Sequence, residues 1–252
     1  MTNKGKYYES QFEEATIELL REAHWQYTFG DDIHRKYTDP LIEEDLRNFL
    51  AAQYKDRDLT TSEIDGIVAN LRNTGGQNDY YALRNAFLLY RDGYDFAYSD
   101  GRDNPFRLEY IDFEHPDHNI FRCVNQFVME QGRENRRPDI LLFVNGIPVC
   151  IIELKNPTKQ NATIRDAHTQ ICTRYMRDIP ALLKYCALAV ISDGAKNALG
   201  TIYTPFEFFY EWKKIENEDK AGKGLDTLRT LIRGALSPER ILEILRDYVY
   251  FP

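Results

Sequence analysis

Two acidic residues and a lysine interrupt otherwise apolar sequence and are the side chains best suited to chemistry. Asp139, Glu153 and Lys155 all lie within RRPDILLFVNGIPVCIIELKNP (136–157). Charges inside apolar strands are costly unless they are paired or bind a metal ion. Two carboxylates and a nearby backbone carbonyl, that of Leu154, are the hard oxygen ligands that Mg²⁺ prefers. The pattern therefore predicts a magnesium site at Asp139, Glu153 and Leu154.

The lysine indicates which reaction such a metal would serve. Side chains alternate along a strand, so Lys155 and Glu153 share one face, with Val149 and Ile151 on the same side. A bound metal polarises a phosphoryl oxygen and acidifies a water molecule. A lysine beside it can orient that water or stabilise charge on the phosphate. Metal-dependent phosphodiester hydrolysis is the chemistry that these residues favour, and a salt-bridge cluster at an edge strand is the alternative.

Whether Asp139 joins that face depends on the turn between the two apolar segments. A two-residue loop with an unbroken ladder would place Asp139 opposite Ile152, on the wrong face. A three-residue loop with Gly146 in a left-handed bulge position places Asp139 opposite Ile151, on the face of Glu153. We therefore expect a bulge or an odd-length loop at this turn.

The rest of the chain divides into elements that could hold this site. The first hundred residues predict helices near 12–23, 40–54, 61–73 and 79–90, with a short aromatic strand at 25–29. Later segments predict strands at 106–113, 119–130, 138–145, 147–155 and 186–193, and helices at 161–178, 225–234 and 238–247. Asn161 or Thr163 would cap the first of these later helices, and the polar segment 216–224 reads as a loop.

These elements predict an α/β fold, with a mixed central β-sheet flanked by helices. We expect one domain, made of a mainly helical N-terminal portion (1–104), a sheet core (105–215) and C-terminal helices (225–252).

Composition excludes several classes of protein. Of 252 residues, 43% are hydrophobic and 13% aromatic, which argues against general disorder. With 40 acidic and 32 basic residues the net charge is -8, so bulk positive charge does not attract nucleic acid. The sequence contains no run of 18 apolar residues, no secretory signal and no CxxC pair, so we expect a cytoplasmic protein without a membrane partner or a thiolate zinc site.

Pro138-Asp139 followed by Glu153-Leu154-Lys155 resembles the PD-(D/E)xK nuclease motif. More specific sequence segments surround this motif, and together they resemble the R (restriction) subunit of type I restriction endonucleases over residues 10–215. These segments are the whole of 136–157, Asn-Gln-Phe at 125–127, NATI at 161–164 and the SDG…A…GT pattern of 192–201. The resemblance implies a restriction-endonuclease-like fold and cleavage of DNA with Mg²⁺.

The resemblance also assigns roles to residues. The metal-binding acids of the family fall on Asp139 and Glu153, and its catalytic lysine falls on Lys155. A QxxxY motif on the following helix has Gln170 as its candidate glutamine. Tyr175 is one residue too far along, about 140° from Gln170 around an α-helix, so we do not include it in the site.

Nucleases of this fold often add an acid from the first helix. Glu14 is the candidate here, and its neighbours Glu13 and Glu18 are alternatives.

Charged residues outside the motif could have structural roles as well as functional ones. Arg136 and Arg137 could contact DNA phosphates or pair with Glu130 or Glu134. The segment HPDH (115–118) has the spacing of some metal sites, but an ordinary loop is the favoured interpretation.

The resemblance implies partners as well. The complete subunit of the family carries two helicase-like domains that use ATP to move DNA, and it works with methyltransferase and specificity subunits. No GxxxxGK[ST] phosphate loop is present here, so we expect this chain not to bind ATP. It would be a fragment of such a subunit, a stand-alone repair or resolvase-type nuclease, or a docking module for the complex.

Overall fold

A mixed sheet lies at the centre of the molecule and confirms the predicted α/β fold. The computed structural model describes residues 3–155, 163–215, 222 and 224–251. Within these residues the sheet has six strands in the order β1-β4-β7-β8-β9-β10. They are β1 (Gln26–Phe29), β4 (Phe121–Asn125), β7 (Ile140–Val144), β8 (Ile147–Leu154), β9 (Leu188–Ser192) and β10 (Asn197–Gly200). β1 is parallel to β4 and β8 to β9, and the other neighbours are antiparallel.

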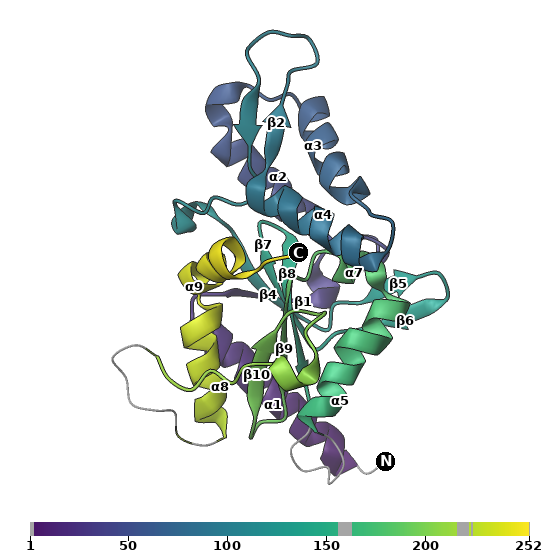
Figure 1. The fold of residues 1–252 in the computed structure, drawn as a ribbon, viewed down its shortest axis with the longest axis vertical. Helices are drawn as coiled ribbons and strands as arrows, with labels where there is room; N and C mark the ends of the chain where they lie inside the picture. The colour runs from purple at the N-terminus through teal and green to yellow at the C-terminus, as the bar shows by residue number, and fades with distance from the viewer. Residues whose placement is uncertain (1–2, 156–162, 216–221, 223, 252) are drawn as a thin grey trace.

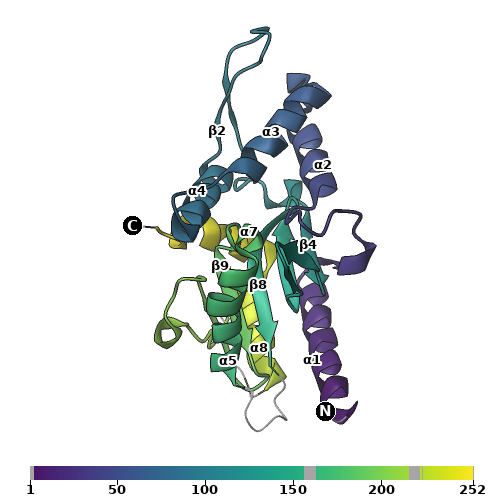
Figure 2. The same cartoon turned by 90° about the vertical axis from the view of Figure 1, so that its right-hand side faces the viewer.

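Helices cover both faces of this sheet (Figure 1). One face packs on α1 (Asn3–Glu22), α8 (Leu225–Leu231) and α9 (Pro238–Glu243), and the other on α5 (Ile164–Thr169), α6 (Met176–Asp178) and α7 (Pro180–Leu183). Figure 2 shows α1 and α5 on opposite sides of β8. Because strand side chains alternate, Ile152 enters the apolar cluster on the α1 side and Ile151 enters the one on the α5 side.

Three further helices form a layer at one end of the sheet, above β7 and β8 in Figure 1. These are α2 (Glu43–Gln53), α3 (Thr61–Asn73) and α4 (Asp79–Asp92). Helix α2 starts later than the sequence predicts, because Asp39 is engaged elsewhere. Its carboxylate accepts the backbone N–H of Leu41 and pairs with Arg72 of α3 at 2.8 Å.

Two predicted strands are shorter than expected. The segment 106–113 yields only β3 (Phe106–Leu108), which pairs with β2 (Tyr94–Phe96) outside the central sheet. The segment 119–130 divides into β4 and β5 (Met129–Gln131), and β5 pairs with β6 (Glu134–Arg136). The break falls at Gln126, whose φ of 55° turns the chain out of the sheet.

The predicted helix at 161–178 begins at Ile164. Thr163 caps it, through a capping box with Asp166. Asn161, the other predicted cap, and almost all of the predicted loop 216–224 lie outside the described residues.

The turn between β7 and β8 has two residues, so the predicted three-residue loop is wrong. Val144 pairs with Ile147, and Asn145 and Gly146 have φ values of 51° and 75°. Positive φ at both central positions is the mark of a type I′ turn, which Asn-Gly favours.

The predicted bulge is present, but it lies inside β8. Phe143 pairs with Pro148 whereas Leu142 pairs with Cys150, so Val149 is the extra residue. The bulge turns Val149 to the α1 side, away from the face on which we expected it.

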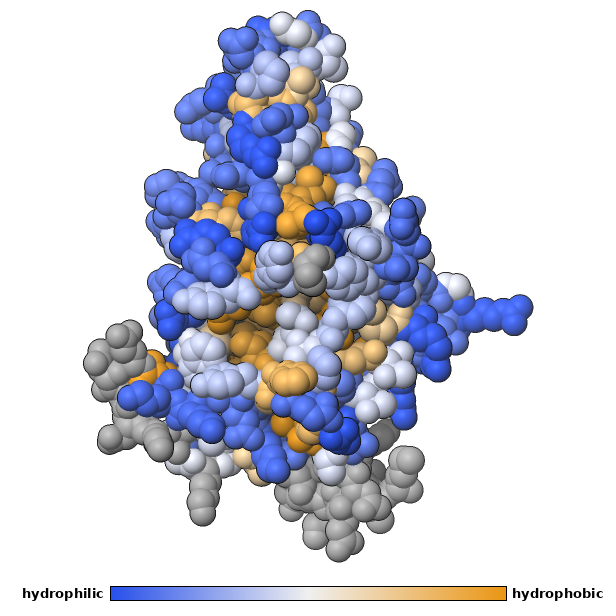
Figure 3. All heavy atoms as spheres, viewed as in Figure 1, coloured by the Kyte–Doolittle hydropathy of each residue, from blue (hydrophilic) through white to orange (hydrophobic). Residues whose placement is uncertain are grey.

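No helix in the described part of the chain is long and apolar enough to cross a membrane. Figure 3 shows hydrophilic residues over the upper helical layer and apolar residues gathered along the middle of the same face.

Candidate functional site

The bulge in β8 brings the two predicted metal-binding acids together. Beyond it Ile140 pairs with Ile152, so the next pair along the ladder is Asp139 with Glu153. Residues directly opposite in an antiparallel pair share a face. Asp139 is also tied to the end of β8, because its Oδ2 accepts the backbone N–H of Leu154 at 2.8 Å.

Glu153 belongs to a closed ring of hydrogen bonds. Its side chain is 1% exposed, and Lys155 Nζ donates to its Oε1 at 2.8 Å. The same Nζ donates to Gln170 Oε1 at 2.7 Å. Gln170 Nε2 reaches the Tyr175 hydroxyl at 2.7 Å, and that hydroxyl lies 3.3 Å from Glu153 Oε2. The ring fixes the lysine and the glutamate in one geometry.

Tyr175 therefore joins the site, although the sequence argument set it aside. The segment Gln170–Tyr175 is a π-helix continuing α5. In a π-helix the hydrogen bonds join residues five apart, so Gln170 and Tyr175 lie one turn apart on the same side. The spacing argument assumed an α-helix throughout, and the wider turn absorbs the additional residue.

Electrostatics at the site favour a cation. The pKa of Glu153 is raised to about 8, because burial and the charge of Asp139 raise it more than Lys155 and Tyr175 lower it. Burial also raises the pKa of the Tyr175 hydroxyl, and Glu153 adds to this effect. A buried carboxylate close to a second, partly buried one is unfavourable without a counter-charge. The residues present fit a hard divalent ion held by Asp139 and Glu153.

Of the three glutamates considered in the first helix (Glu13, Glu14 and Glu18), Glu13 is the one that contacts residues at this end of the sheet. Its carboxylate accepts hydrogen bonds from Asn125 Nδ2 at 2.6 Å and from Gln126 Nε2 at 2.8 Å. Gln126 in turn donates its backbone N–H to the carbonyl of Asp139 at 3.2 Å. Glu14, our candidate, is exposed.

The sequence argument missed roles for Asn125 and Gln126. Asn125 ends β4 and Gln126 follows it, and both bind Glu13, so they connect α1 to β4. The Asn-Gln-Phe segment at 125–127 was the sequence signal that could have indicated these roles. Glu18, the third glutamate considered, pairs with Arg21 on the exposed side of α1.

Arg136 takes the pairing alternative. It binds Glu134 at 2.5 Å and the buried Asp178 at 2.7 Å, which ties the β5–β6 hairpin to α6. Arg137 is exposed.

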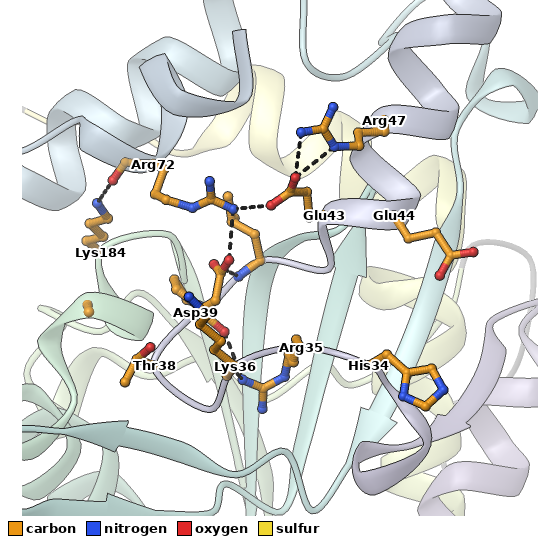
Figure 4. A pocket seen from close by; sticks show the side chains of 13 residues that line it. His34, Arg35, Lys36, Thr38, Asp39, Glu43, Glu44, Arg47, Arg72 and Lys184 are labelled. Carbon is orange, nitrogen blue, oxygen red and sulfur yellow. Dashed lines mark hydrogen bonds and ion pairs between the residues drawn. The ribbon is translucent and has the colours of Figure 1, made fainter. Parts of the chain in front are cut away.

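A cavity of about 670 Å³ lies elsewhere, between the N-terminal loop and α2 (Figure 4). Arg72 in its wall pairs with Asp39 and Glu43, and Lys184 donates to backbone carbonyls. None of the nuclease-motif residues lines it. Arg72 and Lys184 thus make structural contacts there, and the candidate site remains the end of β8.

Comparisons with known proteins agree with the motif. The profile of the family described as "Type I restriction enzyme R protein N terminus" matches residues 6–208. The HindI endonuclease subunit of a type I restriction enzyme from Haemophilus influenzae is 29% identical over 96% of this chain and 24% of its own length. A putative MjaIXP endonuclease subunit from Methanocaldococcus jannaschii is 27% identical over 94% of this chain and 25% of its own.

The EcoprrI endonuclease subunit from Escherichia coli is 32% identical over 49% of this chain. The chain thus spans about a quarter of the length of the first two relatives. The match to the family profile covers the sheet, both candidate metal-binding acids and the helix that completes the ring. This chain belongs to the type I restriction enzyme R protein family and corresponds to its N-terminal part.

Proposed function

We propose that this chain is the nuclease domain of a type I restriction enzyme and that it hydrolyses DNA phosphodiester bonds with Mg²⁺. The observation that carries the proposal is the meeting of Asp139 and Glu153 at one end of β8, where Asp139 accepts the backbone N–H of Leu154 and Lys155 Nζ donates to Glu153. The names of the relatives, which are endonuclease subunits, support the same reaction.

Each residue of the site has a proposed task. Asp139, Glu153 and the Leu154 carbonyl would hold the metal, which when bound would polarise the phosphate and acidify water. Lys155 Nζ would orient the attacking water or stabilise charge on the phosphate oxygens. Gln170 accepts a hydrogen bond from that Nζ and so positions it.

Tyr175 and Glu13 would act indirectly, by positioning other residues of the site. Tyr175 limits the movement of both Glu153 and Gln170 because its hydroxyl contacts each of them. Glu13 would fix the chain before Asp139 through Gln126, whose backbone holds the Asp139 carbonyl.

The partners are proposals too. We propose that the chain acts in the cytoplasm, joined to helicase-like domains that use ATP, and assembled with methyltransferase and specificity subunits on DNA. The relatives are about four times longer than the matched region, which leaves room for such domains.

Substitution in the assembled enzyme tests the nuclease proposal. We expect Glu153→Gln and Lys155→Ala each to reduce DNA cleavage by at least about 100-fold, because each removes a group that acts on the transition-state charge. ATP-driven translocation should stay unchanged, since a separate part of the enzyme performs it. The measurements are plasmid linearisation and triplex displacement on the same preparations.

Glu239→Gln is the matched control, because Glu239 is exposed in α9 and remote from the site. Cleavage at the wild-type rate in Glu153→Gln would overturn the proposal and leave a docking module as the better description. Loss of translocation together with cleavage would show that the substitution damages assembly.

A further inference from the structure

A second cluster of ligand-type side chains lies between β3 and β4. Asp112, His115 and His118 offer one carboxylate oxygen and two imidazole nitrogens within 4.8 Å of one another. His118 ends the short 3-10 helix Pro116–His118, which leads into β4.

This cluster is at the end of the sheet opposite the nuclease site. Asn119, next to His118, accepts a hydrogen bond at 2.8 Å from Asn145 in the β7–β8 turn. Asp139 and Glu153 lie at the other end of the same two strands. The two groups of residues are therefore separate.

The carboxylate of Asp112 is buried, with 4% of the residue exposed, and it is held in place on three sides. Its Oδ1 accepts the backbone N–H groups of Glu114 at 3.0 Å and His115 at 2.9 Å. Its Oδ2 accepts Gln53 Nε2 at 3.0 Å. A carboxylate offers about four lone pairs. Among these contacts one lone pair, on Oδ2, is left.

Two imidazoles converge on that one lone pair. His118 Nδ1 shares a hydrogen bond with Oδ2 at 2.9 Å, which uses this lone pair, and His115 Nδ1 lies 3.4 Å from the same oxygen. Their rings stack with centroids 4.8 Å apart. A single lone pair cannot accept a hydrogen bond from both nitrogens, and two charged rings in contact would repel each other. A cation placed between the three atoms gives all of them a common partner.

We propose that Asp112, His115 and His118 form a binding site for a divalent transition metal such as Zn²⁺ or Co²⁺. Bonds of about 2.1 Å place neighbouring ligands of a four- or six-coordinate ion about 3.0–3.4 Å apart, and the two N···O distances are 2.9 and 3.4 Å. Two imidazoles with one carboxylate suit this class of metal, whereas Mg²⁺ prefers oxygen ligands. Both histidines are at least half exposed, so water would complete the coordination.

The metal would fasten the helical layer to the central sheet. Gln53, which holds the carboxylate, is the last residue of α2, and the two histidines precede β4. Groups that hydrogen bond to a metal ligand fix its orientation and raise metal affinity. Binding to the folded chain alone would stabilise this junction.

Metal titration of the whole chain, without a polyhistidine tag, tests the site. The chain is first treated with EDTA and desalted. Co²⁺ is then added as the probe, and its binding is followed by calorimetry and by the visible absorption of the ion. We expect the wild-type chain to bind one equivalent that persists in the double variant Asp139→Asn/Glu153→Gln. The His118→Ala variant should bind it at least about tenfold more weakly, because it loses a direct ligand.

His34→Ala is the matched control, since His34 is exposed and outside the cluster, and it should bind as the wild type does. His115→Ala provides a second test if His118→Ala is misfolded by circular dichroism. Unchanged affinity in the folded histidine variants would overturn the proposal. So would the absence of binding, or its disappearance in the double variant, which would assign all binding to the nuclease site. Either result leaves the nuclease proposal standing.

Discussion

Burial of Glu153 has an electrostatic cost. Glu153 is buried at the end of β8, with Asp139 as its neighbour across the ladder and Lys155 as its ion-pair partner. Burial and the Asp139 charge raise its pKa to about 8. Without a metal, the positive charge of Lys155 faces two carboxylates, those of Asp139 and Glu153. Protonation of Glu153 and metal binding each relieve the repulsion between these carboxylates.

The raised pKa predicts a pH-dependent stability. The folded state keeps the Glu153 proton up to about pH 8, whereas the unfolded chain loses it near the ordinary value of 4.5. Stability is therefore highest below pH 4.5 for this group and falls as pH rises towards 8. We expect Glu153→Gln to gain at least about 1 kcal/mol relative to wild type between pH 5 and pH 8.5. Urea denaturation in EDTA measures the free energy of unfolding of both proteins. An equal difference between variant and wild type at pH 5 and pH 8.5 would contradict the prediction.

Two one-residue insertions into regular elements assemble the site. The bulge at Val149 shifts the register of β8 so that Glu153 meets Asp139. The π-helical turn after α5 brings Gln170 and Tyr175 to one side. Each insertion changes which side chains face the α5 side of the sheet, and each is a known device at functional sites.

Removing the inserted helical residue should be tolerated. Deletion of the exposed Thr173 would convert the π-turn to an α-turn and leave Gln170 and Tyr175 one turn apart, with the flanking helix still in phase. We expect the melting temperature to stay within about 5 °C of wild type, a change of about 1 kcal/mol. Deletion of the exposed Gly66 is the control.

That control rotates one half of the regular α3 by about 100° and moves Ile67 and Leu71 out of the core. It should unfold the chain. Equal damage from the two deletions, measured by thermal circular dichroism, would show that the π-turn is not a local insertion.

At the scale of the whole molecule, the acidic charge limits how the proposed nuclease could work. A net charge of -8 opposes the phosphate backbone, and phosphate attraction supplies most non-specific affinity for DNA. Part of that charge sits at the proposed metal sites, where it would bind cations instead of repelling DNA. A domain supplied with DNA by a motor does not need to hold it tightly.

The charge predicts weak binding by this chain alone. We expect its dissociation constant for duplex DNA in Ca²⁺, which allows binding without rapid cleavage, to exceed about 10 µM at physiological salt. Any basic patch should be confined to the rim around Asp139 and Lys155. Fluorescence anisotropy measures the affinity. Binding tighter than about 1 µM that persists at high salt would contradict the prediction.

The sequence by itself determined the ingredients of the site. Asp139, Glu153 and Lys155 stand out because charge is rare in apolar strands, and the period of two along a strand indicated that a bulge or an odd-length loop was needed to place Asp139 on the face of Glu153. The Asn-Gly turn favours type I′ locally, so the two-residue loop was available from the sequence as well. The buried strand at 186–193 and the helices that cover it were recognisable for the same reason, their apolar pattern.

Only the tertiary structure decided how these residues face one another. Tyr175 joins the ring because the helix widens into a π-turn while its flanks stay packed on the sheet. Glu13 rather than Glu14 reaches the site because packing of α1 fixes its rotation, and neighbouring residues differ by about 100° around a helix. Such choices depend on contacts between distant segments, which local sequence patterns do not specify.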